Sequence, residues 1–298
     1  MIATVAGQPD IPFCVLIPTR GRWDLLAKTL KKMPFLDSRG VYFGVQNDEY
    51  AKYAYTCFDG LRHARVVAYD NPTGSVAVAR EHLRKDVLRV AHVQMPKYAV
   101  VTDDNAIYTQ ESLNNLVAAT SEYRRHLNGK TVIMAGMHNT AKHFDRNLIP
   151  KKLKVGQFTS YPNVAMIYQC YPMDLYARYR YPANAFGLDD RHFFLWCISQ
   201  GVRDFRVCMD APFTKSRYQP GGQGSILERA DKCGQAIACL ATDFPQYVGC
   251  TGTLRIPWQF ILQMESSDGT FTADRLVGGS MRKEATVARS GTLRIKKR

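Results

Sequence analysis

The stretch Tyr98-Ala-Val-Val-Thr-Asp-Asp-Asn105 joins a short apolar run directly to two carboxylates and an amide. The apolar run predicts a strand, and the polar triplet is expected at its end. Carboxylates at such a place hold hard cations, and bound Mg²⁺ or Mn²⁺ commonly bridges to substrate phosphates. The stretch therefore indicates a nucleotide-diphosphate site. The alternative is that Asp103, Asp104 and Asn105 cap the helix expected over 111–117.

Short apolar runs alternate with amphipathic stretches around this segment, in the order expected of βαβ units. Strands are predicted at 13–17, 41–45, 64–69, 98–102, 131–135 and 205–209, and helices at 23–33, 48–58, 75–90, 193–201 and 226–240. We predict an α/β fold with a mostly parallel, Rossmann-like sheet flanked by helices. A catalytic domain is expected over 1–245, followed by an extension, 246–298, whose basic tail is expected to be mobile.

The composition indicates a globular protein with a strongly anionic partner. Of 298 residues 46% are hydrophobic, and 40 Lys and Arg against 26 Asp and Glu leave a formal charge of +14. Such a balance favours a polyanionic partner or substrate. No run of 18 apolar residues and no leader-like N-terminus is seen, which predicts a soluble, cytoplasmic protein without a membrane span. Eight cysteines without a C-x-x-C pair predict reduced core thiols, and neither zinc ligands nor disulfides.

Two further motifs follow predicted strands. Pro18-Thr-Arg-Gly-Arg22 stands between the first strand and a helix, where open parallel sheets bind ligands and where arginines suit phosphate. Asn71-Pro-Thr-Gly74 follows the third strand, with Arg80 in the next helix. The alternatives are ordinary turn residues at Asn71 and Gly74 and a solvated helix residue at Arg80.

In this order, the motifs resemble the nucleotide-sugar glycosyltransferases of the GT-A fold, in particular the family-2-like group, over about residues 11–210. The resemblance implies a nucleotide-sugar donor, most simply a UDP-sugar, and a divalent Mn²⁺ or Mg²⁺ ion. The implied donor-binding residues are Pro18, Thr19, Arg20, Arg22, Asn71, Gly74, Arg80, Asp103 and Asp104. The implied metal ligands are Asp103, Asp104 and Asn105. Asn105 departs from the usual final aspartate, and no histidine follows the strand at 205–209.

The resemblance also implies a general base that takes the proton of the acceptor hydroxyl. The candidates are Asp189 and Asp190 at the start of the helix predicted over 193–201, with Asp189 preferred. The alternative is an N-cap carboxylate together with a partner of the helix dipole, a part that one of the two residues would play.

Basic groups alternate with aromatic rings in Tyr176-Ala-Arg-Tyr-Arg-Tyr-Pro182, which suits phosphates and unstacked bases, although interfacial packing is the alternative. The segment 282–298 holds seven basic residues and one acidic residue. DNA is therefore the preferred partner. The residues expected to contact acceptor or DNA are Arg178, Arg180, Tyr181, Lys215, Arg217, Arg282, Lys283, Arg294, Lys296 and Lys297.

Within the GT-A group, charge and size make the chain similar to viral enzymes that attach a sugar to a hydroxymethylated pyrimidine of DNA. A bacteriophage protein of this kind would act in the cytoplasm of its host. Two alternatives remain open: a glycosyltransferase with a carbohydrate, lipid or protein acceptor, and a non-catalytic nucleic-acid-binding protein with the same fold. A nucleotidyltransferase ranks last, since no glycine-rich loop with a following lysine occurs near residue 20.

Overall fold

The computed structural model describes residues 3–4, 12–38, 40–59, 61, 64–90, 96–126, 132–137, 157–160, 168–202, 204–209, 226–245, 249–251, 260–263, 273–276 and 292–294. The chain divides into two compact units. The first comprises Met1–Pro72, Ala79–Arg180 and Asp204–Gly222, and the second comprises Thr73–Val78, Tyr181–Arg203 and Gln223–Arg298.

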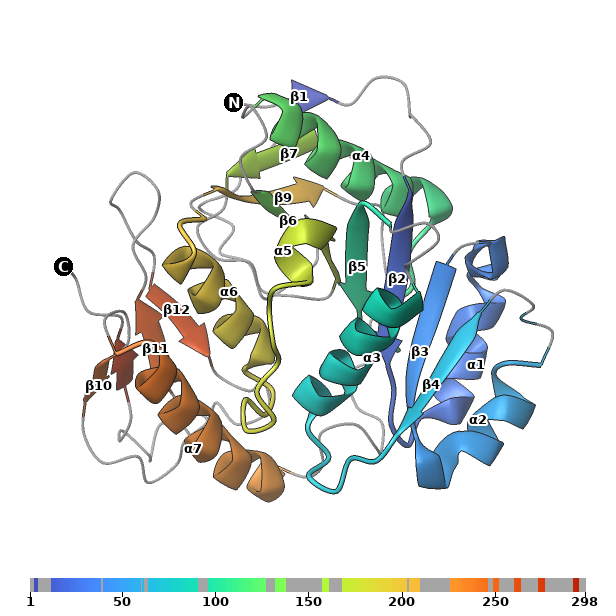
Figure 1. Ribbon diagram of the computed structural model, residues 1–298, viewed down its shortest axis with the longest axis horizontal. Helices are drawn as coiled ribbons and strands as arrows, with labels where there is room; N and C mark the ends of the chain where they lie inside the picture. Colours follow the sequence, from blue (N-terminus) through green and yellow to red (C-terminus); the bar gives the residue numbers. More distant parts are fainter. Residues whose placement is uncertain are drawn as a thin grey trace. The chain divides into compact units, whose positions relative to one another are not determined.

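Figure 1 shows the helices and strands in chain order. The helices are α1 (Trp23–Lys31), α2 (Tyr50–Thr56), α3 (Val76–Val90), α4 (Gln110–His126), α5 (Met173–Tyr176), α6 (Asp189–Ser199) and α7 (Ile226–Asp243), with 3-10 turns η1 (Pro34–Ser38) and η2 (Asn47–Glu49). The strands of the first unit are β1 (Ala3–Thr4), β2 (Phe13–Pro18), β3 (Gly40–Gln46), β4 (Arg65–Tyr69), β5 (Tyr98–Thr102), β6 (Val132–Met137), β7 (Gln157–Ser160), β8 (Tyr168–Pro172) and β9 (Asp204–Met209). Those of the second unit are β10 (Gly249–Thr251), β11 (Phe260–Gln263), β12 (Ala273–Leu276) and β13 (Thr292–Arg294).

The first unit is built on a nine-stranded sheet with the order β1-β7-β9-β6-β8-β5-β2-β3-β4. The strands β5, β2, β3 and β4 are parallel, and β6 is parallel to β9. The predicted α/β class, with a parallel sheet flanked by helices, is confirmed. The strand β8, which runs antiparallel to both β5 and β6, was not predicted. In the second unit β10 pairs with β13 and β11 with β12.

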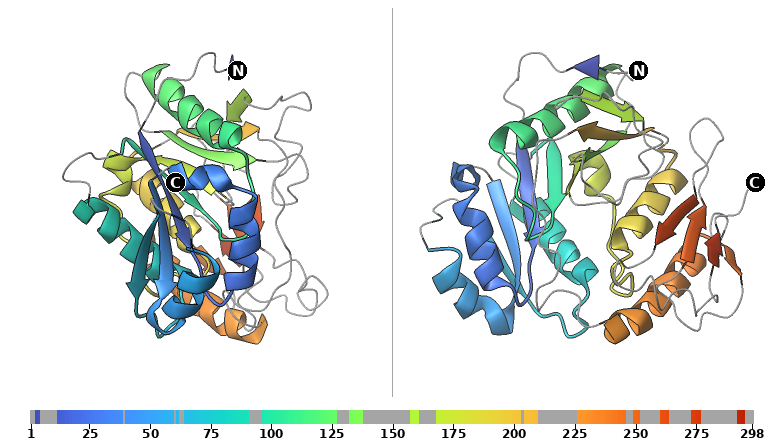
Figure 2. Two further views of the ribbon diagram at one scale, coloured as in Figure 1. Left: turned by 90° about the vertical axis from the view of Figure 1, so that its right-hand side faces the viewer. Right: turned by 180° about the vertical axis from the view of Figure 1, so that it is seen from behind.

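The parallel strands have two buried faces, which is why their sequences are nearly continuous apolar runs. Alternate residues of β2 and β3 point to one face, where Val15, Ile17 and Phe43 form a core with Leu26 of α1 and Leu116 of α4. The helices α1 and α3 lie on opposite faces of these strands (Figure 2, left). Helices therefore cover both faces of these strands. The polar motifs lie in the loops that follow the strands.

Gly44 of β3 lies close to Leu83 of α3. A Cβ atom at this position would stand 3.1 Å from Leu83 Cγ and 3.3 Å from Tyr69 Cε1, whereas one at Gly40 of the same strand would meet nothing nearer than 3.9 Å. We expect Gly44→Ala to lower the free energy of unfolding by about 1–3 kcal/mol through overpacking.

Gly40→Ala is the matched control for Gly44→Ala. We expect it to be neutral or to stabilise by about 0.4–1 kcal/mol, because alanine restricts the unfolded chain. Urea unfolding of both variants measures the difference. Equal stability of the two would contradict the close approach of α3.

Five of the eight cysteines have described side chains, and these five are buried free thiols, in line with the predicted core thiols: Cys14, Cys57, Cys170, Cys197 and Cys239. Burial raises the pKa of Cys14 and of Cys170 to about 12, so both stay protonated at neutral pH. Among the described residues, no helix combines the length and the apolar character needed to span a membrane.

Candidate functional site

The turn after β2 brings Thr19 and Arg22 to the carboxyl end of the parallel sheet. The amide of Thr19 donates to the carbonyl of Gly44 at 2.9 Å, which ties the turn to β3. Gly21 has a φ of 62°, in the left-handed region that only glycine enters freely, and its amide donates to Glu49 Oε2 at 3.1 Å. Arg22 is the N-cap residue of α1. The backbone conformation of this turn therefore favours glycine at position 21.

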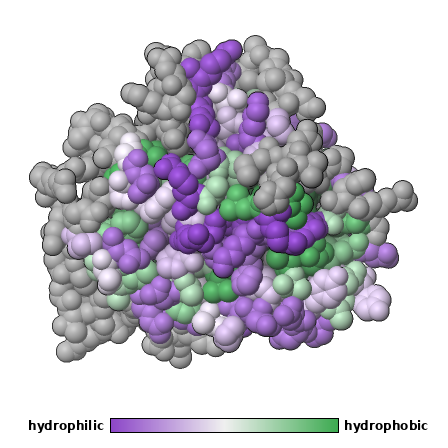
Figure 3. Space-filling model, viewed as in Figure 1, coloured by the Kyte–Doolittle hydropathy of each residue, from purple (hydrophilic) through white to green (hydrophobic). Residues whose placement is uncertain are grey.

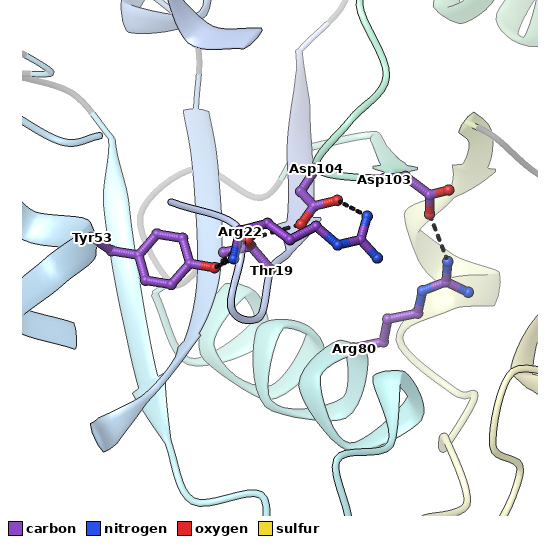
Figure 4. A network of polar contacts seen from close by, with 6 residues as sticks. All are labelled: Thr19, Arg22, Tyr53, Arg80, Asp103 and Asp104. Atoms are coloured by element: carbon purple, nitrogen blue, oxygen red, sulfur yellow. Dashed lines mark hydrogen bonds and ion pairs between the residues drawn. The ribbon is translucent and has the colours of Figure 1, made fainter. Parts of the chain in front are cut away.

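Asp104, which follows β5, is held on both carboxylate oxygens (Figure 4). Arg22 Nη1 lies 3.1 Å from Oδ1, and Thr19 Oγ1 donates to Oδ2 at 2.9 Å. The strands β2 and β5 are parallel neighbours, so their carboxyl ends meet at one edge and bring these residues together across more than 80 positions of sequence. The Asp104 side chain is only 7% exposed, and the Arg22 pair compensates its charge there.

Tyr53 of α2 completes a directional chain of hydrogen bonds that ends at Asp104. The Arg22 amide donates to the Tyr53 hydroxyl at 3.0 Å, and the Tyr53 and Thr19 hydroxyls are 2.8 Å apart. Because the Thr19 hydrogen goes to Asp104, Tyr53 must donate to Thr19. Burial raises the pKa of Tyr53, so its phenol stays protonated and can act as this donor.

Asp103 forms a second, looser pair with Arg80 of α3. Arg80 Nη2 lies 3.8 Å from Asp103 Oδ1, and the exposed fractions of the two side chains are 10% and 27%. Figure 4 shows both Asp–Arg pairs beside each other. Two carboxylates and two guanidinium groups therefore meet at the ends of β2 and β5. Asn105, the third residue of the triplet, is buried.

The helix after this triplet has a different cap. The helix α4 begins at Gln110, and Thr109 Oγ1 accepts a hydrogen bond from the Ser112 amide at 3.0 Å, as an N-cap side chain does. The alternative that Asp103, Asp104 and Asn105 cap this helix is therefore wrong. The carboxylates instead face arginines.

Three other predicted donor-binding residues, Pro18, Arg20 and Asn71, end or follow strands of the first unit. Pro18 is the last residue of β2 and is buried, whereas Arg20 is half-buried. Asn71 follows β4 and is buried, with its carbonyl accepting from Gln46 Nε2 at 3.4 Å. Gly74, which belongs to the second unit, has a φ of 66° and so requires glycine.

Asp189 and Asp190 are the first two residues of α6, which begins four residues earlier than predicted. The N-cap residue is Leu188, without a side-chain capping bond, so neither aspartate is the cap itself. Asp190 Oδ1 accepts from the Arg191 amide at 2.8 Å, and Asp189 is only 3% exposed. Both carboxylates therefore lie in the first turn, where the helix dipole stabilises negative charge.

The predicted acceptor residues differ in exposure. Hydrophilic side chains gather over α3 and the segment after α5 (Figure 3), where Arg180 is 78% exposed and lies 3.9 Å from Glu81. Arg178 Nε donates to the Asp174 carbonyl at 3.3 Å. Tyr181 is buried and stacks on Phe193 with ring centroids 6.5 Å apart. The Tyr181 ring therefore has a packing role, which was the alternative considered for this segment. A buried ring cannot stack on a nucleic-acid base.

Seven predicted acceptor residues cannot be placed at a site. Six of them lie outside the described residues: Lys215, Arg217, Arg282, Lys283, Lys296 and Lys297. Arg294 ends β13, but its side chain is not among those described. Their contact with DNA stays a prediction.

Tyr53 and Glu49 were not predicted to belong to the site. Tyr53 is fully buried, whereas the neighbouring Tyr50 and Tyr55 of the same helix are 43% and 86% exposed. The sequence offers no signal that separates these three tyrosines, because the distinction depends on which face of α2 meets the sheet.

The Asp103 and Asp104 carboxylates fit a hard divalent cation by donor type, since Mg²⁺ and Mn²⁺ prefer oxygen ligands. Each carboxylate offers about four lone-pair directions. Asp104 contacts Arg22 and Thr19, and Asp103 is the more exposed of the two carboxylates. The two aspartates can therefore hold a cation while the arginines remain close to a bound anion.

No protein-family model and no curated protein matches the chain. Among solved structures it is similar to residues 1–349 of TarS from S. aureus, in complex with UDP, with a TM-score of 0.49 and 11% identity, covering 78% of this chain and 66% of that one. The chain thus spans just under two thirds of that structure. It is also similar to glucosyl-3-phosphoglycerate synthase from Mycobacterium tuberculosis, in complex with Mn²⁺ and UDP-glucose, with a TM-score of 0.44 and 11% identity, covering 82% and 84%. At these scores the similarities establish neither family nor activity.

Proposed function

We propose that the chain is a glycosyltransferase of the GT-A fold, which moves a sugar from a nucleoside-diphosphate donor to an acceptor hydroxyl. The observation that carries the proposal is the pair of Asp–Arg contacts, Asp104 with Arg22 and Asp103 with Arg80, at the carboxyl ends of adjacent parallel strands. Ligands of open α/β sheets bind at such strand ends. The ordered motifs at Pro18–Arg22, Asn71–Arg80 and 103–105 support the same assignment.

Sugar transfer places specific demands on this site. When the bond between the anomeric carbon and the diphosphate breaks, negative charge develops on the leaving phosphate. Arg22 and Arg80 carry permanent positive charge and have guanidinium donors suited to phosphate oxygens. The hydrogen bonds from Thr19 and Arg22 hold the Asp104 carboxylate in one orientation. A divalent cation held by Asp103 and Asp104, with Asn105 beside them, would supply further positive charge to the leaving group when bound.

Asp189 is proposed as the general base that removes the acceptor proton, with Asp190 as the second candidate. The support is motif position and burial: Asp189 stands in the first turn of α6 and is 3% exposed. A general base must come within hydrogen-bond reach of the proton that it removes. Asp190 binds the backbone amide of Arg191.

DNA with a hydroxymethylated pyrimidine is the proposed acceptor. The support is charge: the chain carries +14, and 282–298 alone holds seven of its 40 Lys and Arg residues. Arg180, 78% exposed, adds a cationic side chain among the described residues. An enzyme that modifies a base of duplex DNA must first expose that base, and backbone phosphate contacts stabilise the complex.

The test is nucleoside-diphosphate release from a panel of UDP- and GDP-sugars with Mn²⁺, with and without hydroxymethylated DNA. We expect one donor to be turned over and that turnover to rise with hydroxymethylated DNA, but not with unmodified DNA of the same sequence. Donor turnover that DNA does not stimulate would indicate that the acceptor is a carbohydrate, a lipid or a protein. Absence of turnover with every donor would favour a non-catalytic nucleic-acid-binding protein.

A further inference from the structure

Three side chains with metal-binding atoms converge in the second unit. His192 lies on α6, and Cys239 and Asp243 lie on α7. His192 Nε2 is 2.8 Å from Asp243 Oδ2, and Cys239 Sγ is 3.4 Å from the same oxygen. All three ligand atoms lie within 4.8 Å of one another. In the part of the chain that the structure describes, this is the one such group of three or more His, Cys, Asp or Glu side chains.

Two of the three distances in this group are close to those of a tetrahedral zinc site, and the third pair, His192 and Cys239, lies within 4.8 Å. Zinc bonds of about 2.0–2.3 Å at tetrahedral angles place neighbouring ligand atoms about 3.3–3.6 Å apart. The Cys239–Asp243 distance of 3.4 Å already lies in this range, and the His192–Asp243 distance of 2.8 Å needs to open only slightly. Cys239 and Asp243 are four residues apart on one helix, so they share a face without strain.

The types of ligand atom in this group favour zinc over Mg²⁺, Ca²⁺ and Mn²⁺. A thiolate and an imidazole are ligands that zinc prefers, whereas Mg²⁺, Ca²⁺ and Mn²⁺ favour sites made only of oxygen. A site with sulfur, nitrogen and one carboxylate oxygen therefore differs in kind from the carboxylates Asp103 and Asp104. This difference allows the two sites to be loaded and tested separately.

The surroundings hold the ligands in place and leave an entry path. The His192 ring packs edge-on against Phe244, with centroids 4.8 Å apart at 64°. His192 and Cys239 are both buried, each 6% exposed. The Asp243 side chain, however, is 43% exposed, so an ion can reach the group from solvent. An ordered imidazole, a buried thiol and an accessible carboxylate are the features of a site that can exchange its ion.

We propose that His192, Cys239 and Asp243 bind one Zn²⁺ ion, with water at the fourth position, and that this ion links α6 to α7. This departs from the prediction that no cysteine of the chain is a zinc ligand. His192 stands three residues after Asp189 on α6, so the ion would also steady the helix that carries the proposed base. The proposal does not depend on the reaction, because it rests only on the ligand atoms of two helices.

The experiment uses the full chain, stripped with a chelator and titrated with Zn²⁺ alone in competition with a chromophoric chelator. We expect one zinc per chain, and a loss of affinity of at least about 100-fold in Cys239→Ser and Asp243→Ala, which exceeds the effect of losing an outer partner. Co²⁺ in place of zinc should give a thiolate charge-transfer band that Cys239→Ser lacks. Zinc should raise the Tm of the wild type but not that of Asp243→Ala.

Two control variants show whether zinc binding is specific to these three side chains. Cys197→Ser removes a buried thiol of α6 that is not in the group, and Asp104→Asn alters the strand-end carboxylates, so both should keep the wild-type zinc affinity. Asp243→Ala changes an exposed side chain, so it remains informative if Cys239→Ser does not fold. Failure of the folded wild type to bind zinc stoichiometrically would overturn the proposal, as would unchanged affinity in Asp243→Ala and Cys239→Ser.

Discussion

Asp104→Asn is expected to slow nucleoside-diphosphate release by about 10²–10³-fold, the range seen when one preorganised electrostatic group is removed. The carboxylate accepts from Thr19 on one oxygen and from Arg22 on the other. An amide has only one acceptor oxygen, and its NH₂ group would face a donor. Arg22 would lose its counter-charge, and both its position and the proposed cation site would be disturbed.

The matched control for Asp104→Asn is Tyr53→Phe. This variant keeps the Asp104 carboxylate and its charge but removes the hydroxyl that orients Thr19. We expect a loss of about tenfold, consistent with one neutral hydrogen bond of about 0.5–1.5 kcal/mol. Circular dichroism and thermal unfolding show whether both variants remain folded. If folded Asp104→Asn turns over donor at the wild-type rate, the strand-end site is not where the donor reacts.

Asp189→Asn is the second large effect that we expect, a fall in kcat of about 10²–10⁴-fold, the usual contribution of a general base. The amide is nearly the same size but cannot take a proton. The helix should still form, because Leu188 is its N-cap residue and the Asp189 side chain is not the cap. The rate of sugar transfer across pH should also lose the rise on the acid side that protonation of a base produces.

Asp190→Asn is the neighbouring control for Asp189→Asn. Its carboxylate binds the Arg191 amide at 2.8 Å, a local role within the first turn of α6. We expect at most about a tenfold loss of kcat, because the amide oxygen of asparagine can still accept the hydrogen bond from the Arg191 backbone. Steady-state kinetics of both variants with the donor found in the panel distinguishes the two residues. A large loss of kcat in Asp190→Asn together with a small loss in Asp189→Asn would identify Asp190 as the general base.

The strand-end motifs could be predicted because each depends on a few consecutive residues. Tyr98–Thr102 forms β5 with the predicted bounds, and Phe13–Ile17 lies within β2. Continuous apolar runs are typical of buried parallel strands. Glycines are typical of turns, and Gly21 and Gly74 have the positive φ angles that turns often need. Sheet order was harder to predict. The strand β8 lies between β5 and β6 and is antiparallel to both. The sequence of a five-residue strand does not indicate which strands it pairs with or in which direction.

The sequence by itself determined the α/β class, the polar residues at the ends of β2 and β5 and the carboxylates that begin α6, since strand length, turn chemistry and helix starts are local properties. Tertiary structure decided which residues meet. It joined Thr19, Tyr53 and Asp104 in one hydrogen-bonded chain, buried Tyr181 against Phe193, and brought His192 to Cys239 and Asp243. These contacts join residues from 12 to 85 positions apart. They arise only when neighbouring strands align their ends and helices choose the face that packs, which is a property of the whole folded chain.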